Sequence, residues 1–335
     1  MAMKQKVKKF IGEWWKDVYS TVWLMFKIMI PVSIVVKILK EVGAIEWIGE
    51  LLAPVMQWVG LPGEMGLVWA TGMITNLFGG LLAFFQISEG MNLSIEQVSV
   101  ISVMMLVAHT FPIELEIARK AGVRIWFSFL WRFLFAFVLG WLIHLVYSRI
   151  PMFSATATVS WRPEAAPDPS LADWALGELK SYAIILAFIV SLILVVKLMK
   201  EFGLIRLIQK ALAPLFRLLG IGENATTVTI IGLTLGIVYG GALIINESGT
   251  REIRRRDVFY SLAFMGLCHS VIEDTLLVVA IGADWIAVLL IRLVFALLLT
   301  AVLVRLMNRL SDRNFMRFMM TRSALQNGVT KDKTQ

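Results

Sequence analysis

The hydrophobic positions of this chain form long runs that are separated by short polar, glycine-rich or proline-rich breaks. Val22–Val36, Ala183–Val196 and Ile286–Val304 are close to uninterrupted apolar runs. A helix needs about 20 mostly apolar residues to cross the hydrocarbon core of a bilayer. The pattern therefore predicts an all-α polytopic membrane protein.

The apolar segments occur in the same order in both halves of the chain. Each half offers a long apolar helix, an amphipathic stretch, a glycine-broken segment, a helix interrupted by polar residues and a closing helix. In that order the ranges are 19–40 and 181–200, 44–59 and 204–219, 63–89 and 223–249, 98–118 and 258–278, and 125–148 and 286–308.

An internal repeat explains this order. Every matched pair lies the same number of positions apart, as His109 and His269 do (269 − 109 = 160). Gly60, Gly72, Gly80, Arg132 and Phe135 return in this register as Gly220, Gly232, Gly240, Arg292 and Phe295. Because the register holds through polar residues without a gap, we interpret the halves as two copies of one structural unit.

Loop charge predicts that the two copies have opposite orientations. Met91–Glu96 contains no Lys or Arg, whereas its counterpart Arg251–Arg256 contains four Arg residues. Because cytoplasmic loops carry an excess of Lys and Arg, equivalent loops should face opposite sides of the membrane. We therefore expect an inverted-topology repeat, in which each half has three crossing helices, an interfacial helix and a re-entrant helical hairpin. The hairpin tips are expected at Gly79-Gly80 and Gly240-Gly241, where the backbone must turn at membrane depth.

The same pattern divides the chain into five parts. We expect a cytoplasmic amphipathic N-terminus (1–18), a first repeat (19–148), an extracytoplasmic linker (149–180), a second, inverted repeat (181–308) and a basic cytoplasmic tail (309–335). The linker is expected to be extended because it contains four prolines. The basic residues at both ends predict a multi-pass protein of the inner membrane with cytoplasmic N- and C-termini.

Composition narrows the function classes. The net charge of +8 would suit nucleic-acid binding, but the Lys and Arg residues gather at segment ends and in the C-terminal tail, as in cytoplasmic loops. We therefore expect no nucleic-acid partner. The single cysteine, Cys268, excludes an internal disulfide. No P-loop is present, so energy for transport would come from a gradient or a separate partner.

Ionisable residues within the apolar segments are the main candidates for function. The interrupted helices contain His109, Thr110, Glu114 and Glu116 in the first half and His269, Ser270, Glu273 and Asp274 in the second. These groups suit a cation, a proton or a hydrogen-bonding solute, and His109, His269 and Glu273 are the candidate metal ligands. In the alternative interpretation they pair with one another or with Arg132 and Arg292 and hold helices together.

The glycine-broken segments carry a second set of polar candidates. Asn76 and Gln86 lie in the first hairpin, and Asn246 and Glu247 lie in the second. They could bind solute. They could equally cap the hairpin helices, because polar side chains favour helix ends.

The duplicated unit and the motif Asn76-Leu77-Phe78-Gly79-Gly80 resemble the nucleoside-recognition or Gate family. This family includes the spore maturation proteins A and B and the membrane core of ferrous iron transporter B, and it is distantly similar to concentrative nucleoside transporters. The resemblance implies paired re-entrant hairpins and transport, often by a homo-oligomer. Gln86-Ile87-Ser88-Glu89 is only loosely similar to the hairpin signature of nucleoside transporters, so the resemblance does not identify the solute.

We expect a gradient-driven secondary transporter that binds a small polar or ionic solute near the midplane, between the two hairpins and the two interrupted helices. No cofactor is expected, and H⁺ or Na⁺ would be the coupling ion. One alternative is a divalent metal permease, because His and carboxylate groups suit such ions. Another is a structural or regulatory membrane protein without transport. An enzyme is not expected, because no nucleophile is evident beside His269.

Overall fold

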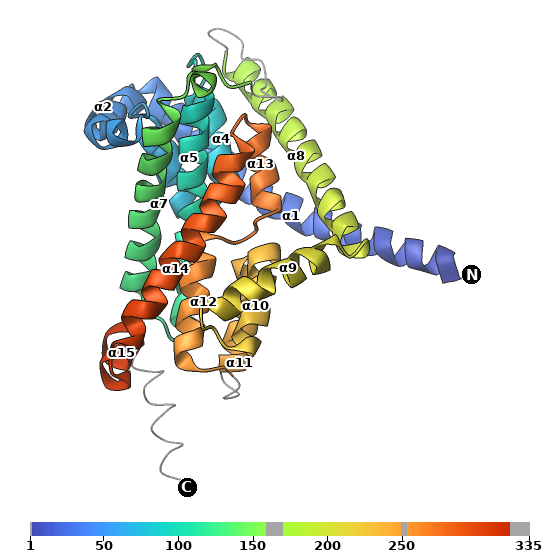
Figure 1. Ribbon diagram of the computed structural model, residues 1–335. Helices are drawn as coiled ribbons and strands as arrows, with labels where there is room; N and C mark the ends of the chain where they lie inside the picture. The colour runs from blue at the N-terminus through green and yellow to red at the C-terminus, as the bar shows by residue number, and fades with distance from the viewer. Residues whose placement is uncertain (1, 159–169, 249–252, 322–335) are drawn as a thin grey trace.

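The computed structural model describes residues 2–158, 170–248 and 253–321, and the regular secondary structure of this part is helical (Figure 1). Two long helices, α1 (Ala2–Glu41) and α8 (Leu171–Glu201), contact each other and flank the other helices. The Tyr182 hydroxyl of α8 donates a hydrogen bond of 3.3 Å to the Met29 carbonyl of α1. These two helices open the first and the second half of the chain.

A short amphipathic helix follows each long helix. These are α2 (Ala44–Met56), which η1 (Gln57–Val59) extends, and α9 (Leu204–Leu218). Gly43 and Gly203 make the two connections with φ angles of 68° and 73°, a left-handed conformation that a β-carbon would strain. The same backbone turn at the same repeat position supports the duplication that the sequence predicts.

Each half then forms a helical hairpin. In the first half, α3 (Met65–Ile74) and α4 (Leu77–Ile87) are connected through Thr75 and Asn76. In the second half, α10 (Glu223–Leu235) and α11 (Ile237–Ser248) are connected through Gly236, whose φ angle is 99°. The Asn76 side chain accepts a hydrogen bond of 2.9 Å from the Gly79 amide and so caps α4.

The predicted hairpin tips at Gly79-Gly80 and Gly240-Gly241 are wrong. These glycines lie within α4 and α11, after the turns. Two of them serve packing between the arms: a β-carbon on Gly80 would lie 3.1 Å from the Gly72 α-carbon, and one on Gly240 would lie 2.5 Å from the Gly232 α-carbon. Glycine at these two positions allows the arms of each hairpin to approach closely. The turns themselves form at Thr75-Asn76 and at Gly236.

The interrupted helices are broken at equivalent positions. In the first half α5 (Ile95–Val107) ends before α6 (Phe111–Lys120), and in the second α12 (Arg255–Leu267) ends before α13 (Glu273–Ala280). Thr110 and Ser270 lie in the breaks with positive φ angles of 53° and 46°. Positive φ is uncommon for residues with a β-carbon, so both copies hold a strained break in the same place.

A closing helix completes each half. In the first half it is α7 (Ile125–Tyr147), and η2 (Pro151–Ser154) follows it. In the second half it consists of η3 (Ile286–Ile291), a π-helical segment, and α14 (Arg292–Asn308). A last short helix, α15 (Asp312–Met319), packs beside the start of α7, since its end pairs with Val123.

Two predicted boundaries lie inside helices of the structure. Residues 2–18 continue directly into the first long helix, and α8 begins at Leu171, within the predicted linker. The predicted tail contains α15. The start of α8 is helical because Ser170 caps it and its apolar residues contact α1, where Lys37 lies 5.7 Å from the Trp174 ring. Residues 159–169 and 322–335, parts of the predicted linker and tail, lie outside the described residues.

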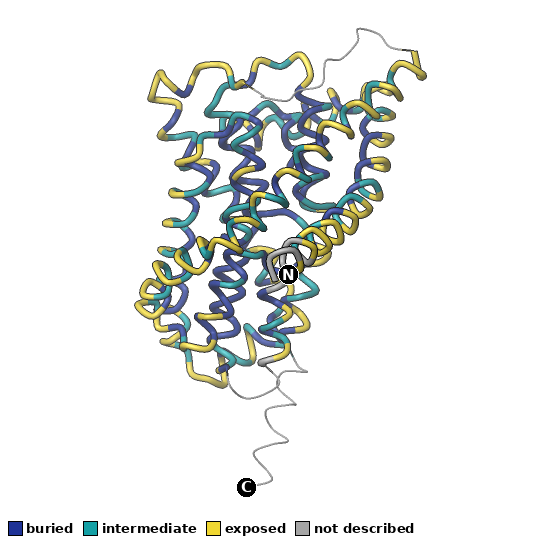
Figure 2. Tube along the Cα trace, turned by 90° about the vertical axis from the view of Figure 1, so that its right-hand side faces the viewer, coloured by how far each residue is buried: buried dark blue, intermediate teal, exposed yellow. Residues whose placement is uncertain are grey.

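Within the described residues, five helices are long and apolar enough to cross a membrane: Phe10–Glu41, Ile95–Lys120, Ile125–Tyr147, Leu171–Glu201 and Ile286–Asn308. Four of these segments expose apolar side chains on their outer faces: α1, α7, α8 and the segment formed by η3 and α14. The fifth segment, which contains α5, is mostly buried (Figure 2). The chain is therefore a polytopic helical membrane protein with the interrupted helix of the first half at its centre. A sixth crossing by α12 and α13 stays a prediction.

Candidate functional site

His109 and His269, the equivalent histidines of the two repeats, face each other at the centre of the molecule. Their Nε2 atoms lie 3.2 Å apart. Their exposed fractions are 5% and 2%, so both rings are buried. Each histidine comes from the break of an interrupted helix, and the fold thus brings the two breaks together.

The hairpins hold these breaks by backbone hydrogen bonds. The Thr110 amide donates a bond of 3.0 Å to the Gly72 carbonyl of α3. The Val271 amide donates one of 2.9 Å to the Leu233 carbonyl of α10. The predicted site residue Thr110 therefore contributes its backbone amide to this contact, and Ser270, like Thr110, lies in a break with a positive φ angle.

The second ring nitrogen of each histidine has an acceptor partner. His109 Nδ1 lies 2.8 Å from the Met105 carbonyl oxygen, and His269 Nδ1 lies 2.7 Å from the Met265 carbonyl oxygen. A carbonyl oxygen only accepts, so each Nδ1 carries the proton. In a neutral imidazole the other nitrogen then presents a lone pair, and the two Nε2 lone pairs point into the same space.

Glu114 joins the two histidines to a buried arginine. Its Oε1 lies 3.6 Å from His109 Nε2 and 3.4 Å from His269 Nε2. Its other oxygen, Oε2, forms an ion pair of 2.5 Å with Nη1 of Arg132. A third electron-pair donor therefore converges on the two imidazole nitrogens.

Arg132 and Arg292 satisfy the free carbonyls at the ends of the broken helices. Arg132 donates to the Val107 and His109 carbonyls at 2.8 and 2.9 Å. Arg292 donates to the equivalent carbonyls of Leu267 and His269 at 3.2 and 2.9 Å. The sequence analysis names these arginines only as possible partners of the polar residues on the interrupted helices, although their matched positions in the repeat are a signal for this role.

Asp274 occupies the repeat position that corresponds to Glu114 (274 − 160 = 114). It is 8% exposed, and in the described part of the chain its Oδ2 has no hydrogen-bond partner. Nη1 of Arg292 also has none among the described residues. Ligand atoms of His109, His269 and Asp274 all lie within 4.8 Å of one another, so these three residues could hold a metal ion.

The remaining candidates on the interrupted helices lie outside this group. Glu116 is half-buried and accepts hydrogen bonds of 2.6 and 2.7 Å from Arg119, so it is part of a surface ion pair. Glu273 is half-buried, and Asp274 takes the position beside the histidines that the sequence analysis assigned to Glu273. The metal role of Glu273 stays a prediction.

The polar residues of the hairpins are distributed over several places. Gln86 donates hydrogen bonds of 2.7 Å to Ser33 and 2.9 Å to Glu178, which tie α4 to α1 and α8. Asn246 is exposed, and the side chain of Glu247 lies outside the described residues. Asn76 caps α4, as the alternative interpretation of the sequence suggested. None of these contacts with described residues brings a hairpin side chain to the two histidines.

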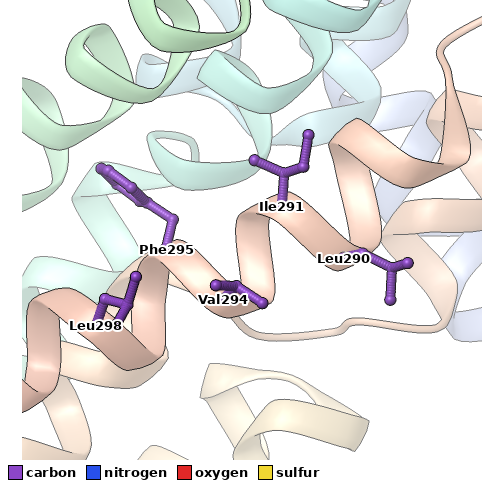
Figure 3. Close-up of a pocket in the computed structure, with 5 residues that line it drawn as sticks. All are labelled: Leu290, Ile291, Val294, Phe295 and Leu298. Atoms are coloured by element: carbon purple, nitrogen blue, oxygen red, sulfur yellow. The ribbon is translucent and has the colours of Figure 1, made fainter.

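An apolar hollow lies on the outer side of the second closing helix. Leu290, Ile291, Val294, Phe295 and Leu298 line it (Figure 3). A hollow with this lining suits a hydrocarbon chain or an apolar side chain and offers no polar group to a hydrophilic solute. The buried histidines are therefore the better candidate site.

Comparisons with known proteins agree with the resemblance seen in the sequence. Residues 22–124 match the family model for the Gate domain, described as nucleoside recognition. A relative from Bacillus subtilis (strain 168), the uncharacterized membrane protein YvoD, is 29% identical over 288 residues, which cover 84% of this chain and 90% of the relative. No solved structure matches. The family resemblance is thus confirmed over residues 22–124, and the chain is a multi-pass membrane protein.

Proposed function

We propose that this protein is a secondary transporter of a small polar or ionic solute and that the solute binds at the paired histidines. The observation that carries the proposal is the contact of His109 with His269, whose Nε2 atoms lie 3.2 Å apart in a buried position. Ionisable groups inside a membrane protein are costly and mark solute or ion pathways. A purely structural bundle has no need of two equivalent, strained breaks around such groups.

The proposed membrane arrangement is an inverted repeat. The two hairpins would enter from opposite faces, the interfacial helices α2 and α9 would lie at the two surfaces, and both termini would be cytoplasmic. The contrast between the loop Met91–Glu96, which has no Lys or Arg, and the basic loop Arg251–Arg256 supports this orientation. In such transporters the solute site lies near the midplane, where discontinuous helices meet.

The hydrogen bonds between hairpins and breaks suggest how access could alternate. One hairpin holds the first break at Thr110 and the other holds the second break at Val271. Movement of the first hairpin would open the histidines towards one side, while the second hairpin kept the other side closed. The helices α1 and α8, which contact each other and α4 and α9 respectively, would serve as the scaffold.

Uptake into proteoliposomes tests this proposal. Purified protein would be assayed with a nucleoside (uridine), a small organic acid (lactate) and divalent metal ions (Zn²⁺ and Mn²⁺) as separate probes. We expect saturable uptake of at least one probe above that of empty liposomes, and a loss of this uptake in the variant His109→Gln/His269→Gln. The variant His144→Gln is the matched control, because His144 is the third histidine and pairs with Glu96 instead. Equal uptake in the double variant and the wild type would overturn the proposed site.

A further inference from the structure

The three electron-pair donors at the centre have the spacing of ligands around one small cation. His109 Nε2, His269 Nε2 and Glu114 Oε1 are separated by 3.2, 3.4 and 3.6 Å. Two ligands of a tetrahedral ion with bonds of 2.0–2.1 Å are about 3.3 to 3.4 Å apart. The measured separations therefore fit a tetrahedral metal site, with the ion between the three atoms.

The protonation of the rings supports the same conclusion. Both Nδ1 atoms donate to backbone carbonyls, those of Met105 and Met265, so both Nε2 atoms point their lone pairs inward. Metal-binding histidines typically donate their other ring N–H to a carbonyl or carboxylate, which orients the ring and raises its basicity. Two lone pairs and a carboxylate oxygen repel one another unless a positive species lies between them.

Asp274 is placed where it could provide a fourth ligand. Its carboxylate lies within 4.8 Å of the two histidine ligand atoms, and its Oδ2 has no hydrogen-bond partner in the described part of the chain. An unpartnered carboxylate oxygen in such a buried position is costly. Coordination of a cation by this oxygen would remove that cost.

From this geometry we infer that the centre binds a divalent first-row transition-metal ion such as Zn²⁺, Fe²⁺ or Co²⁺. The ligands are His109, His269 and Asp274, with Glu114 shared between the ion and Arg132. Two imidazole nitrogens with carboxylate oxygens are typical for these ions, whereas Mg²⁺ and Ca²⁺ prefer oxygen ligands alone. The inference rests on the proposed function in one respect: it identifies this ion as the transported solute.

Two guanidinium groups directly behind the ligands suit a carried ion rather than a permanently held one. Arg132 is bound to Glu114, and Arg292 is anchored at the His269 carbonyl. Their positive charges oppose a dication in the same buried space and weaken its binding. Conduction through a site requires binding that is favourable enough for entry and weak enough for release.

Metal binding to the purified full-length chain, prepared without a polyhistidine tag, tests the inference. Zn²⁺ would be measured by equilibrium dialysis and elemental analysis, and Co²⁺ by its visible absorption, which reports tetrahedral coordination. We expect one ion per wild-type chain, with the intense spectrum of tetrahedral Co²⁺. The variants His109→Gln, His269→Gln and Asp274→Asn should lose this ion and its spectrum, and His144→Gln should keep both.

The results of the metal-binding and uptake assays distinguish the metal inference from the proposed transport function. Absence of a bound ion in the folded wild type, or equal binding in His269→Gln, would overturn the metal inference even if the uptake assay detects another solute. A specific bound ion without uptake of any probe would support the metal site and overturn the proposed transport. If His269→Gln fails to fold, Asp274→Asn still tests the inference, because the asparagine side chain has nearly the same shape as the aspartate it replaces.

Discussion

Glu114 and Asp274 hold equivalent positions in the two repeats, yet only Glu114 forms an ion pair with the arginine of its own half. Glu114 Oε2 lies 2.5 Å from Arg132 Nη1, whereas no ion pair joins Asp274 to Arg292 in the described part of the chain. The aspartate side chain is one methylene group shorter. The centre therefore combines one carboxylate that is paired with the arginine of its own half and one that is not, and this difference could not arise from a strictly symmetric repeat.

Exchange of the two carboxylates should reverse this difference. In Asp274→Glu the longer side chain should reach Arg292, and we expect a higher thermal midpoint of unfolding. In Glu114→Asp the ion pair with Arg132 should be lost, at a cost of about 1–3 kcal/mol for the unsatisfied buried groups. Differential scanning fluorimetry in detergent checks both variants. A stabilised Glu114→Asp variant would contradict the role of side-chain length.

Loss of a buried guanidinium should be strongly destabilising. Arg132→Met removes the partner of Glu114 and leaves a buried charge, which typically costs about 3–5 kcal/mol. We expect the double variant Arg132→Met/Glu114→Gln to be less destabilised than Arg132→Met alone, because it leaves no unpaired charge. Urea or thermal unfolding of the single and double variants measures the difference. A double variant less stable than the single one would show that the pair does not act as a unit.

The close contact between the hairpin arms predicts where a methyl group is harmful. A β-carbon on Gly240 would lie 2.5 Å from the Gly232 α-carbon, so Gly240→Ala should cost about 1–3 kcal/mol. Gly177 is the matched control, because it lies in the helix α8 and a β-carbon there meets nothing within 4 Å. Gly177→Ala should be neutral or slightly stabilising. Equal thermal midpoints for the two variants would contradict the predicted packing.

Two arginines tether the last helix, α15, to the first and second halves of the chain. Arg124 donates hydrogen bonds to the carbonyls of Met320 and Arg317, and Arg256 donates to Asp312 Oδ1 at the start of α15. We expect the variant Arg124→Ala/Arg256→Ala to release α15. Limited trypsin digestion should then cleave after Arg313 or Arg317 faster than in the wild type, and an unchanged rate would contradict the tether.

The central contact could be anticipated from the sequence because duplication constrains it. Since His109 and His269 occupy the same repeat position, any two-fold arrangement that places one histidine near the axis places both there. The hairpin turns could not be located in this way. Glycine occurs both where helices pack closely and where the chain turns tightly. The sequence therefore does not show whether Gly80 packs against Gly72 or forms the tip of the hairpin.

Details that depend on side-chain reach were also beyond the sequence. Periodicity places Glu273 and His269 on one helix face, but the chain is not helical between Cys268 and Ile272. Asp274, instead of Glu273, therefore lies with the histidines. Residue spacing also could not reveal that both Nδ1 atoms would donate to carbonyls, because that requires the exact orientation of the rings.

The most direct test of the central claim is Zn²⁺ uptake by proteoliposomes that contain the wild type, His109→Gln, His269→Gln or His144→Gln. We predict saturable uptake in the wild type and in His144→Gln, and uptake no greater than that of empty liposomes in the other two variants. Uptake that persists unchanged without His109 or His269 would contradict the assignment of the paired histidines as the site through which the solute passes.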